Sequence, residues 1–93
     1  MARVVVAATA QADLEALIAS RSLPTSTRDR VRAHLAPLRS FPLLGRELSG
    51  PWAPLRVLLG PWPWLLIVYR YDDANDVVTI VALADSRTST APQ

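Results

Sequence analysis

The sequence predicts an α+β protein in which one strand and two helices precede three strands. Three patterns indicate this order. A run of β-branched residues opens the chain, helix-spaced apolar residues follow it, and apolar segments separated by turn-forming residues make up the C-terminal half. Successive helices followed by successive strands are typical of an antiparallel sheet with helices on one face. We therefore expect a β-α-α-β-β-β order, with a helical hairpin packed on one face of an antiparallel sheet.

The N-terminal half is expected to form one strand and two helices. Residues 3–8 contain three consecutive valines and are predicted to be a strand. Thr9 is placed to cap a helix over residues 10–20, whose leucines and isoleucine recur at helical spacing. Residues 26–29 have the spacing of a capping box and open a second helix. Pro37 lacks an N–H, so this helix is expected to kink there or to end just before it.

The C-terminal half is expected to form a meander of three strands. Residues 41–54 are rich in proline and glycine and are predicted to be a loop. The strands are predicted over residues 55–59, 64–71 and 77–84. The second of them is apolar without interruption, which favours a central strand covered on both faces. We expect a single domain over residues 1–93, with a short flexible polar tail from about residue 88.

Composition excludes several kinds of site. The 93 residues include no cysteine, which rules out disulfides and thiolate chemistry, and the single histidine, His34, rules out a histidine-rich metal site. We expect neither a metal nor a cofactor. The longest apolar run, residues 57–69, is broken by glycine and proline and is shorter than the roughly 20 residues that span a bilayer. With no signal peptide in the N-terminal segment, we expect a soluble cytoplasmic protein without a membrane partner.

All ten cationic side chains are arginines, and the formal net charge is +2. One interpretation is the codon bias of a GC-rich genome. The other is recognition of phosphate by the planar guanidinium group. A net charge of +2 gives little bulk attraction for nucleic acid, so any contact with RNA would have to be local.

Short motifs in a fixed order carry a family resemblance. Residues 41–50, FPLLGRELSG, match the pattern F-P-x-x-G-x-x-L-x-G. Together with this segment, the motif-bearing segments are residues 9–14, 48–52, 55–57, 67–73 and 84–87. In this order and spacing they resemble the RelE/ParE toxin superfamily of type II toxin–antitoxin systems, over about residues 3 to 88.

The resemblance implies a toxin that stops growth when free. It also implies a cognate antitoxin, encoded by an adjacent gene, with an acidic or amphipathic C-terminal segment that wraps over the toxin. The target stays open between two branches of the superfamily. One branch cleaves messenger RNA on the ribosome, and the other poisons DNA gyrase. A third hypothesis is a non-toxic interaction module that retains only antitoxin binding.

Arg56 and Arg87 are the candidate catalytic residues if the chain cleaves RNA. Metal-independent cleavage needs a base for the 2′-hydroxyl, a cation for the developing phosphorane charge and an acid for the leaving oxygen. Strand alternation places Arg56 on the face opposite its apolar neighbours, from which it is expected to look out over the concave side of the sheet. Arg87 matches the superfamily position of a phosphate-binding arginine. For both, the alternative is an ion pair, Arg56 with Glu47 and Arg87 with Asp85.

Two departures from the superfamily pattern put RNA cleavage in doubt. Leu66 stands where active ribonuclease members usually carry an arginine, three residues before Tyr69. No tyrosine or histidine follows Arg87. His34 lies in the second predicted helix and is interpreted as a partly exposed helix residue. Loss of a positioned acid or base lowers a rate by about 10²–10⁴, which slightly favours a toxin that acts by binding.

Trp52, Trp62 and Trp64 are predicted to contact a partner protein or to close an edge of the core. All three lie at prolines or at the start of a strand, where such rings more often meet protein than nucleic acid. Stacking on bases is the alternative. Tyr69 and Tyr71 share one face of their strand with apolar residues and are expected to pack in the core.

Overall fold

The computed structural model describes residues 1–87. Its elements are, in chain order, β1 (Arg3–Val6), α1 (Ala8–Arg21), α2 (Thr27–Leu35), the 3-10 helix η1 (Ala36–Arg39), β2 (Arg46–Glu47), the 3-10 helix η2 (Gly50–Trp52), β3 (Arg56–Leu59), β4 (Leu65–Asp72) and β5 (Val77–Asp85). The predicted order of one strand, two helices and three strands is confirmed. The tail expected from about residue 88 lies outside the described residues.

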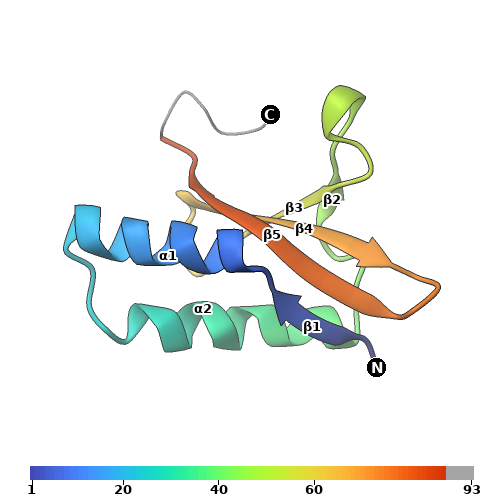
Figure 1. Ribbon diagram of the computed structural model, residues 1–93, viewed down its shortest axis with the longest axis horizontal. Helices are drawn as coiled ribbons and strands as arrows, with labels where there is room; N and C mark the ends of the chain where they lie inside the picture. The colour runs from blue at the N-terminus through green and yellow to red at the C-terminus, as the bar shows by residue number, and fades with distance from the viewer. Residues whose placement is uncertain (88–93) are drawn as a thin grey trace.

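The sheet is mixed, so the expectation of an antiparallel sheet is wrong for one strand. Its five strands lie in the order β1-β5-β4-β3-β2, and β1 pairs in parallel with β5. The pairs β2–β3, β3–β4 and β4–β5 are antiparallel, as a meander requires. β1 is not part of this meander. The chain leaves β1 through two helices and not through a tight turn, and a connection of that length allows parallel pairing. Both helices lie on one side of the sheet, as predicted (Figure 1).

The structure corrects the predicted start of α1 and agrees with the predicted end of α2. The prediction that Thr9 caps α1 is wrong: the helix begins at Ala8, with Ala7 at the N-cap position. Thr9 lies inside the first turn and donates a hydrogen bond from its hydroxyl to the carbonyl of Val81, at 2.8 Å, which ties α1 to β5. α2 ends at Leu35, as expected for a helix that meets Pro37, and the chain continues as η1.

The predicted loop over residues 41–54 contains two short elements that its composition hid. Residues 46 and 47 form β2 on the edge of β3, in the register Arg46 to Val57 and Glu47 to Arg56. Residues 50–52 form η2, which rises beyond the sheet (Figure 1). A strand of two residues has no periodicity to detect, since period-2 alternation needs at least four residues.

The main core lies between the helices and one face of the sheet. Tyr69, Ile67 and Leu65 face this core from β4, in agreement with the predicted packing of Tyr69. The other fully or nearly buried residues of the cluster are Ala2, Ala10, Val31, Leu35, Leu38, Val78, Ile80 and Leu83. Alternation along β4 turns Leu66, Val68 and Arg70 to the face without helices. Within residues 1–87, no helix is long and apolar enough to cross a membrane.

Candidate functional site

Two tryptophans and two arginines form a stack at one end of the sheet. The rings of Trp62 and Trp64 are nearly parallel, with centroids 5.7 Å apart and an interplanar angle of 14°. The guanidinium carbon of Arg30 lies 4.7 Å from the Trp62 ring centroid, and that of Arg87 lies 4.8 Å from the Trp64 centroid. The order of contacts is therefore Arg30, Trp62, Trp64, Arg87. Each outer contact is a cation–π interaction.

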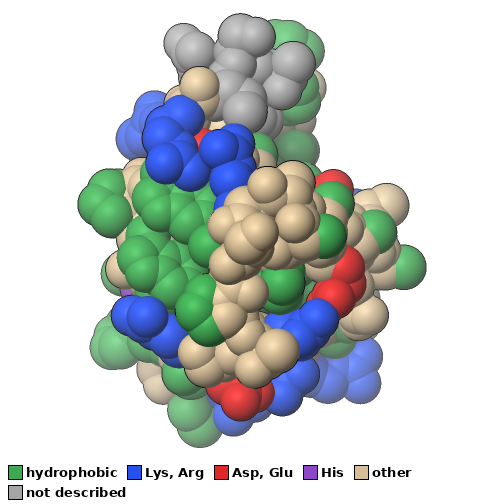
Figure 2. Space-filling model, turned by 90° about the vertical axis from the view of Figure 1, so that its left-hand side faces the viewer, with side chains coloured by type: hydrophobic (Ala, Val, Ile, Leu, Met, Phe, Trp, Pro, Cys, Tyr) green, Lys and Arg blue, Asp and Glu red, His purple; other side chains and the backbone are tan. Residues whose placement is uncertain are grey.

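Three separate parts of the chain position this stack. Both tryptophans lie in the connection between β3 and β4, Arg30 comes from α2, and Arg87 follows the end of β5. The backbone N–H of Ser86 donates a 2.7 Å hydrogen bond to the carbonyl of Trp64, which holds the end of β5 beside the tryptophans. Figure 2 views this end of the molecule and shows a hydrophobic patch with arginine side chains on its borders.

Asp85 anchors Arg87 and also Arg21. Its side chain is only 1% exposed and lies 2.6 Å from Arg21 and 2.9 Å from Arg87. Arg87 binds Asp85 in a bidentate manner: its Nε and one terminal nitrogen donate to the two carboxylate oxygens. The backbone N–H of Arg87 donates to the same carboxylate. These hydrogen bonds outweigh burial and, with the charge of Arg21, lower the pKa of Asp85 to about 2.

The chemistry of this surface fits protein binding. Tryptophan and arginine are the side chains most enriched in the energetic centres of protein interfaces. Arg21 and Arg87 remain 39% and 55% exposed, although both bind Asp85. Each tryptophan already has a ring on one side and a guanidinium group near it, so a nucleobase would have to displace an arginine to stack there. We call the set Arg21, Arg30, Trp62, Trp64 and Arg87 the arginine–tryptophan cluster.

Arg56 lies elsewhere, on the helix-covered side of the sheet and not over an open concave face. It is paired in register with the core residue Tyr69, and directly paired residues share a face. Its guanidinium group donates a 2.8 Å hydrogen bond to the carbonyl of Gly45 and lies 4.0 Å from Glu47. Arg56 therefore braces the segment before β2. The ion pairs given as alternatives for Arg56 and Arg87 are both present.

Tyr69, the acid–base residue paired with Arg56 across β3 and β4, is sealed from solvent. Tyr69 is 0% exposed, and its hydroxyl accepts a 2.7 Å hydrogen bond from the backbone N–H of Gly45. Burial raises the pKa of Tyr69, against the opposing effects of that hydrogen bond and of the charge of Arg56. A neutral phenol with no access to solvent is poorly placed to take a proton from an RNA hydroxyl.

The remaining candidates lie apart from the cluster. Trp52 ends η2 and is 42% exposed, separated from Trp62 and Trp64 in the fold. Leu66 pairs with Leu59 and Ala84 on the face without helices. The ring of His34 lies 2.7 Å from the carbonyl oxygen of Leu59, so it links α2 to the end of β3. Among residues 1–87 there is no group of three or more histidine, aspartate or glutamate side chains placed to hold a metal ion.

Sequence reasoning missed Arg21 and Arg30. Both lie on helices, where an arginine is ordinarily a solvated residue, and nothing local connects Arg30 with a tryptophan 32 positions later. The sequence did contain one signal for a contact of this kind, which is the composition of the connection between β3 and β4. Two tryptophans next to prolines in a five-residue connection are costly to expose and require cover from another element.

The order of elements and the five-strand mixed sheet with two helices on one face define the RelE/ParE fold. The chain belongs to the family described as the ParE toxin of the type II toxin–antitoxin system parDE, whose model matches residues 4–89. No curated protein sequence matches it.

Solved structures of similar fold include two from toxin–antitoxin systems and one mutant toxin. The chain is similar to a protein of the RelBE2 toxin–antitoxin complex from Mycobacterium tuberculosis, with 23% identity and a TM-score of 0.63 over 90% of this chain and 96% of that one. It is also similar to a copper-bound mutant toxin from Helicobacter pylori, with 22% identity and a TM-score of 0.68 over 91% and 94%. A chain of the chromosomal ParDE system from P. aeruginosa gives 14% identity and a TM-score of 0.68 over 91% and 96%.

Proposed function

We propose that this protein is a growth-inhibiting toxin that acts in the cytoplasm by binding a protein target, and that a cognate antitoxin encoded by an adjacent gene neutralises it. DNA gyrase is the target we propose, because one branch of the superfamily poisons gyrase and the incomplete catalytic set favours a toxin that acts by binding. The observation that carries the proposal is the family match over residues 4–89. Two of the similar folds come from toxin–antitoxin systems, RelBE2 and ParDE, which supports an antitoxin partner.

The geometry supports binding over RNA cleavage. Arg87 is committed to Asp85 and to the Trp64 ring, and Arg56 is committed to the carbonyl of Gly45. Beside Arg56, Tyr69 is buried, and the Glu47 carboxylate is the ion-pair partner of Arg56 at 4.0 Å. A cleavage site needs an accessible base and acid in addition to cations. The arginine–tryptophan cluster, in contrast, has the composition of a protein-binding surface.

The decisive experiment is tightly controlled induction of this gene alone, with pulse-labelling of DNA and protein synthesis. We expect arrest of growth and of DNA synthesis while protein synthesis continues, and relief of the arrest when the neighbouring gene is co-expressed. Purified protein should inhibit gyrase in a supercoiling assay with the same dependence on the antitoxin.

Three other outcomes identify the alternatives. Cut transcripts on translating ribosomes, with normal replication, would establish mRNA cleavage, and the double variant Arg56→Ala/Arg87→Ala should then lose that cleavage. Arrest of replication without any effect on gyrase would point to another protein target. Harmless expression of a chain that still binds the product of the neighbouring gene would establish an interaction module without toxicity.

A further inference from the structure

The cations of the arginine–tryptophan cluster outnumber the acids that bind them. Asp85 is bound by Arg21 and by Arg87. Arg30 forms no ion pair within residues 1–87, and its guanidinium group lies over the Trp62 ring. Three arginines against one aspartate leave two positive charges in excess. This excess lies beside two tryptophan rings that are only partly buried.

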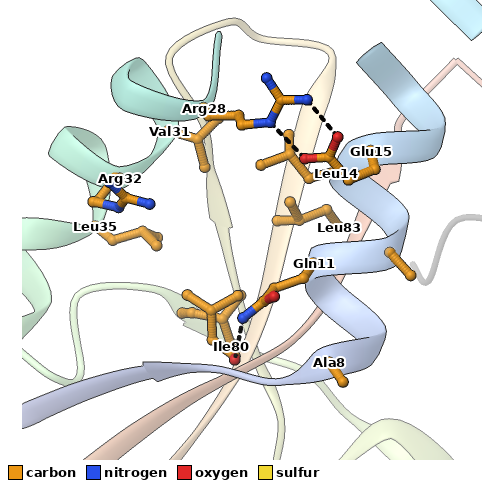
Figure 3. A pocket seen from close by; sticks show the side chains of 12 residues that line it. Ala8, Gln11, Leu14, Glu15, Arg28, Val31, Arg32, Leu35, Ile80 and Leu83 are labelled. Atoms are coloured by element: carbon orange, nitrogen blue, oxygen red, sulfur yellow. Dashed lines mark hydrogen bonds and ion pairs between the residues drawn. The ribbon is translucent and has the colours of Figure 1, made fainter. Parts of the chain in front are cut away.

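The acidic residues of the neighbouring helices do not compensate Arg30. Arg28, two positions earlier in α2, points to Glu15 on α1 (Figure 3). The Arg28 Nε donates to one oxygen of this carboxylate at 2.6 Å, and a terminal nitrogen donates to the other. Asp29, next to Arg30 in the chain, lies 3.8 Å from Arg32. Both carboxylates are therefore paired with other arginines, and the charge of Arg30 is open to a partner.

Asp85 fixes two guanidinium groups without using all their donors. Each guanidinium group has five N–H bonds. Arg87 donates to Asp85 from its Nε and one terminal nitrogen, and Arg21 contacts the carboxylate through one terminal nitrogen. Both side chains stay partly exposed. A carboxylate that arrives from outside therefore meets guanidinium groups that are already ordered, which lowers the entropy cost of binding.

The stack sets the distance between its cationic ends. Because contacts of 4.7, 5.7 and 4.8 Å join them through the two rings, the guanidinium groups of Arg30 and Arg87 lie at most about 15 Å apart. A strand of about five residues or a helix of about three turns spans this distance. One short segment of a partner consequently reaches both ends, and its central side chains lie over the tryptophan rings.

We propose that the arginine–tryptophan cluster recognises an acidic segment of the target protein, in which carboxylates at two positions flank apolar side chains. The carboxylates bind Arg30 at one end and Arg87 with Arg21 at the other, and the apolar side chains cover the two rings. This rests on the proposed function, because it assumes that the toxin acts on a protein. Nucleic acid is a poorer occupant, since its backbone is a continuous row of phosphates that offers the rings no apolar group.

The first test is inhibition of purified gyrase by charge-neutralised variants in a supercoiling assay. The double variant Arg21→Gln/Arg30→Gln removes two charges at exposed positions and leaves the bidentate ion pair at the end of β5 intact. The control, Arg46→Gln/Arg70→Gln, removes the same charge from exposed positions on the face without helices. We expect the half-inhibiting concentration to rise about tenfold or more in the cluster variant and to stay within about twofold of the wild type in the control. A cooperative urea transition verifies that each variant is folded.

The second test measures recognition of carboxylates without gyrase. The variant Trp52→Phe leaves the two tryptophans of the cluster as the fluorescent rings. It is titrated with the peptide Glu-Glu-Leu-Leu-Leu-Glu-Glu and with a control peptide in which glutamine replaces every glutamate. We expect saturable quenching by the acidic peptide and binding of the glutamine peptide that is weaker by about tenfold or more. Adding Arg21→Gln/Arg30→Gln should abolish this difference.

The two tests separate this site from the proposed target. Inhibition of gyrase by the cluster variant at wild-type concentrations would overturn the site and leave the target standing. A wild type without effect on gyrase, but with cluster-dependent binding of the acidic peptide, would overturn the target and support the recognition of acidic segments. Equal affinity for the two peptides, or quenching by a short DNA duplex alone, would overturn that recognition.

Discussion

The backbone N–H of Gly45 donates a 2.7 Å hydrogen bond to the hydroxyl of Tyr69, a side chain that is 0% exposed. This bond joins the segment before β2 to the centre of the sheet. The same segment is held on its other side by Arg56, which donates to the carbonyl of Gly45. The backbone N–H and C=O of Gly45 are thus both bound by side chains, one from β4 and one from its neighbour β3.

Replacing Tyr69 with phenylalanine should destabilise the protein by about 1–2 kcal/mol, because a buried N–H loses its acceptor. Urea unfolding followed by tryptophan fluorescence measures the change. Tyr71→Phe is the matched control, since its hydroxyl bonds to the exposed residue Asp76, and we expect a smaller loss. Equal losses in the two variants would contradict a special role for the Gly45 contact.

Gly45 is expected to tolerate no side chain. A β-carbon there would lie 2.7 Å from a Tyr69 ring carbon and 2.8 Å from the carbonyl oxygen of Val57. Gly45→Ala should therefore cost about 1–3 kcal/mol of unfolding free energy, as overpacking does. Gly50→Ala serves as comparison: a methyl group there meets open space, but a φ of 64° should cost about 1–2 kcal/mol. A neutral Gly45→Ala variant would show that the segment moves away from Tyr69 easily.

The Asp85 carboxylate should make the protein sensitive to acid. Its folded pKa of about 2 lies below the ordinary 3.8, so the unfolded chain binds a proton more readily. The resulting stability is fully present above the ordinary value and is lost as the pH falls towards about 2. Asp85→Asn should flatten this part of the stability–pH curve, measured by urea midpoints between about pH 2 and pH 5. Asp29→Asn, at an exposed pair, should follow the wild type.

The arginine–tryptophan cluster is expected to carry toxicity. Arg30→Ala/Arg87→Ala removes both guanidinium groups from the tryptophan rings and should raise survival after induction by roughly tenfold or more, as loss of interface hot spots does. Arg46→Ala is the control, an exposed arginine outside the cluster. Binding of the antitoxin verifies that the double variant is folded. Undiminished killing by a folded double variant would place the target-binding surface elsewhere.

The sequence predicted what local patterns encode. Helix periods and strand alternation gave the order of the elements, and the missing N–H of Pro37 gave the end of α2. The parallel pairing of β1 was not predictable, because it depends on contacts between residues more than 70 positions apart, such as Val4 with Val78. The candidate site, too, was predictable only where its residues are brought together by local structure. Trp62, Trp64 and Arg87 are close because one turn and one strand end meet, whereas Arg30 joins them only through the packing of α2.

The position of β5 has a consequence for how the protein is made. This strand lies between β1 and β4, yet it is the last of the strands to be synthesised. β1 and the helices therefore have no sheet to rest on until residues up to Asp85 have left the ribosome. Contacts between such distant parts of a chain form late and slowly. A nascent chain consequently lacks the finished arginine–tryptophan cluster, because Arg87 reaches the tryptophan rings only after β5 has joined the sheet.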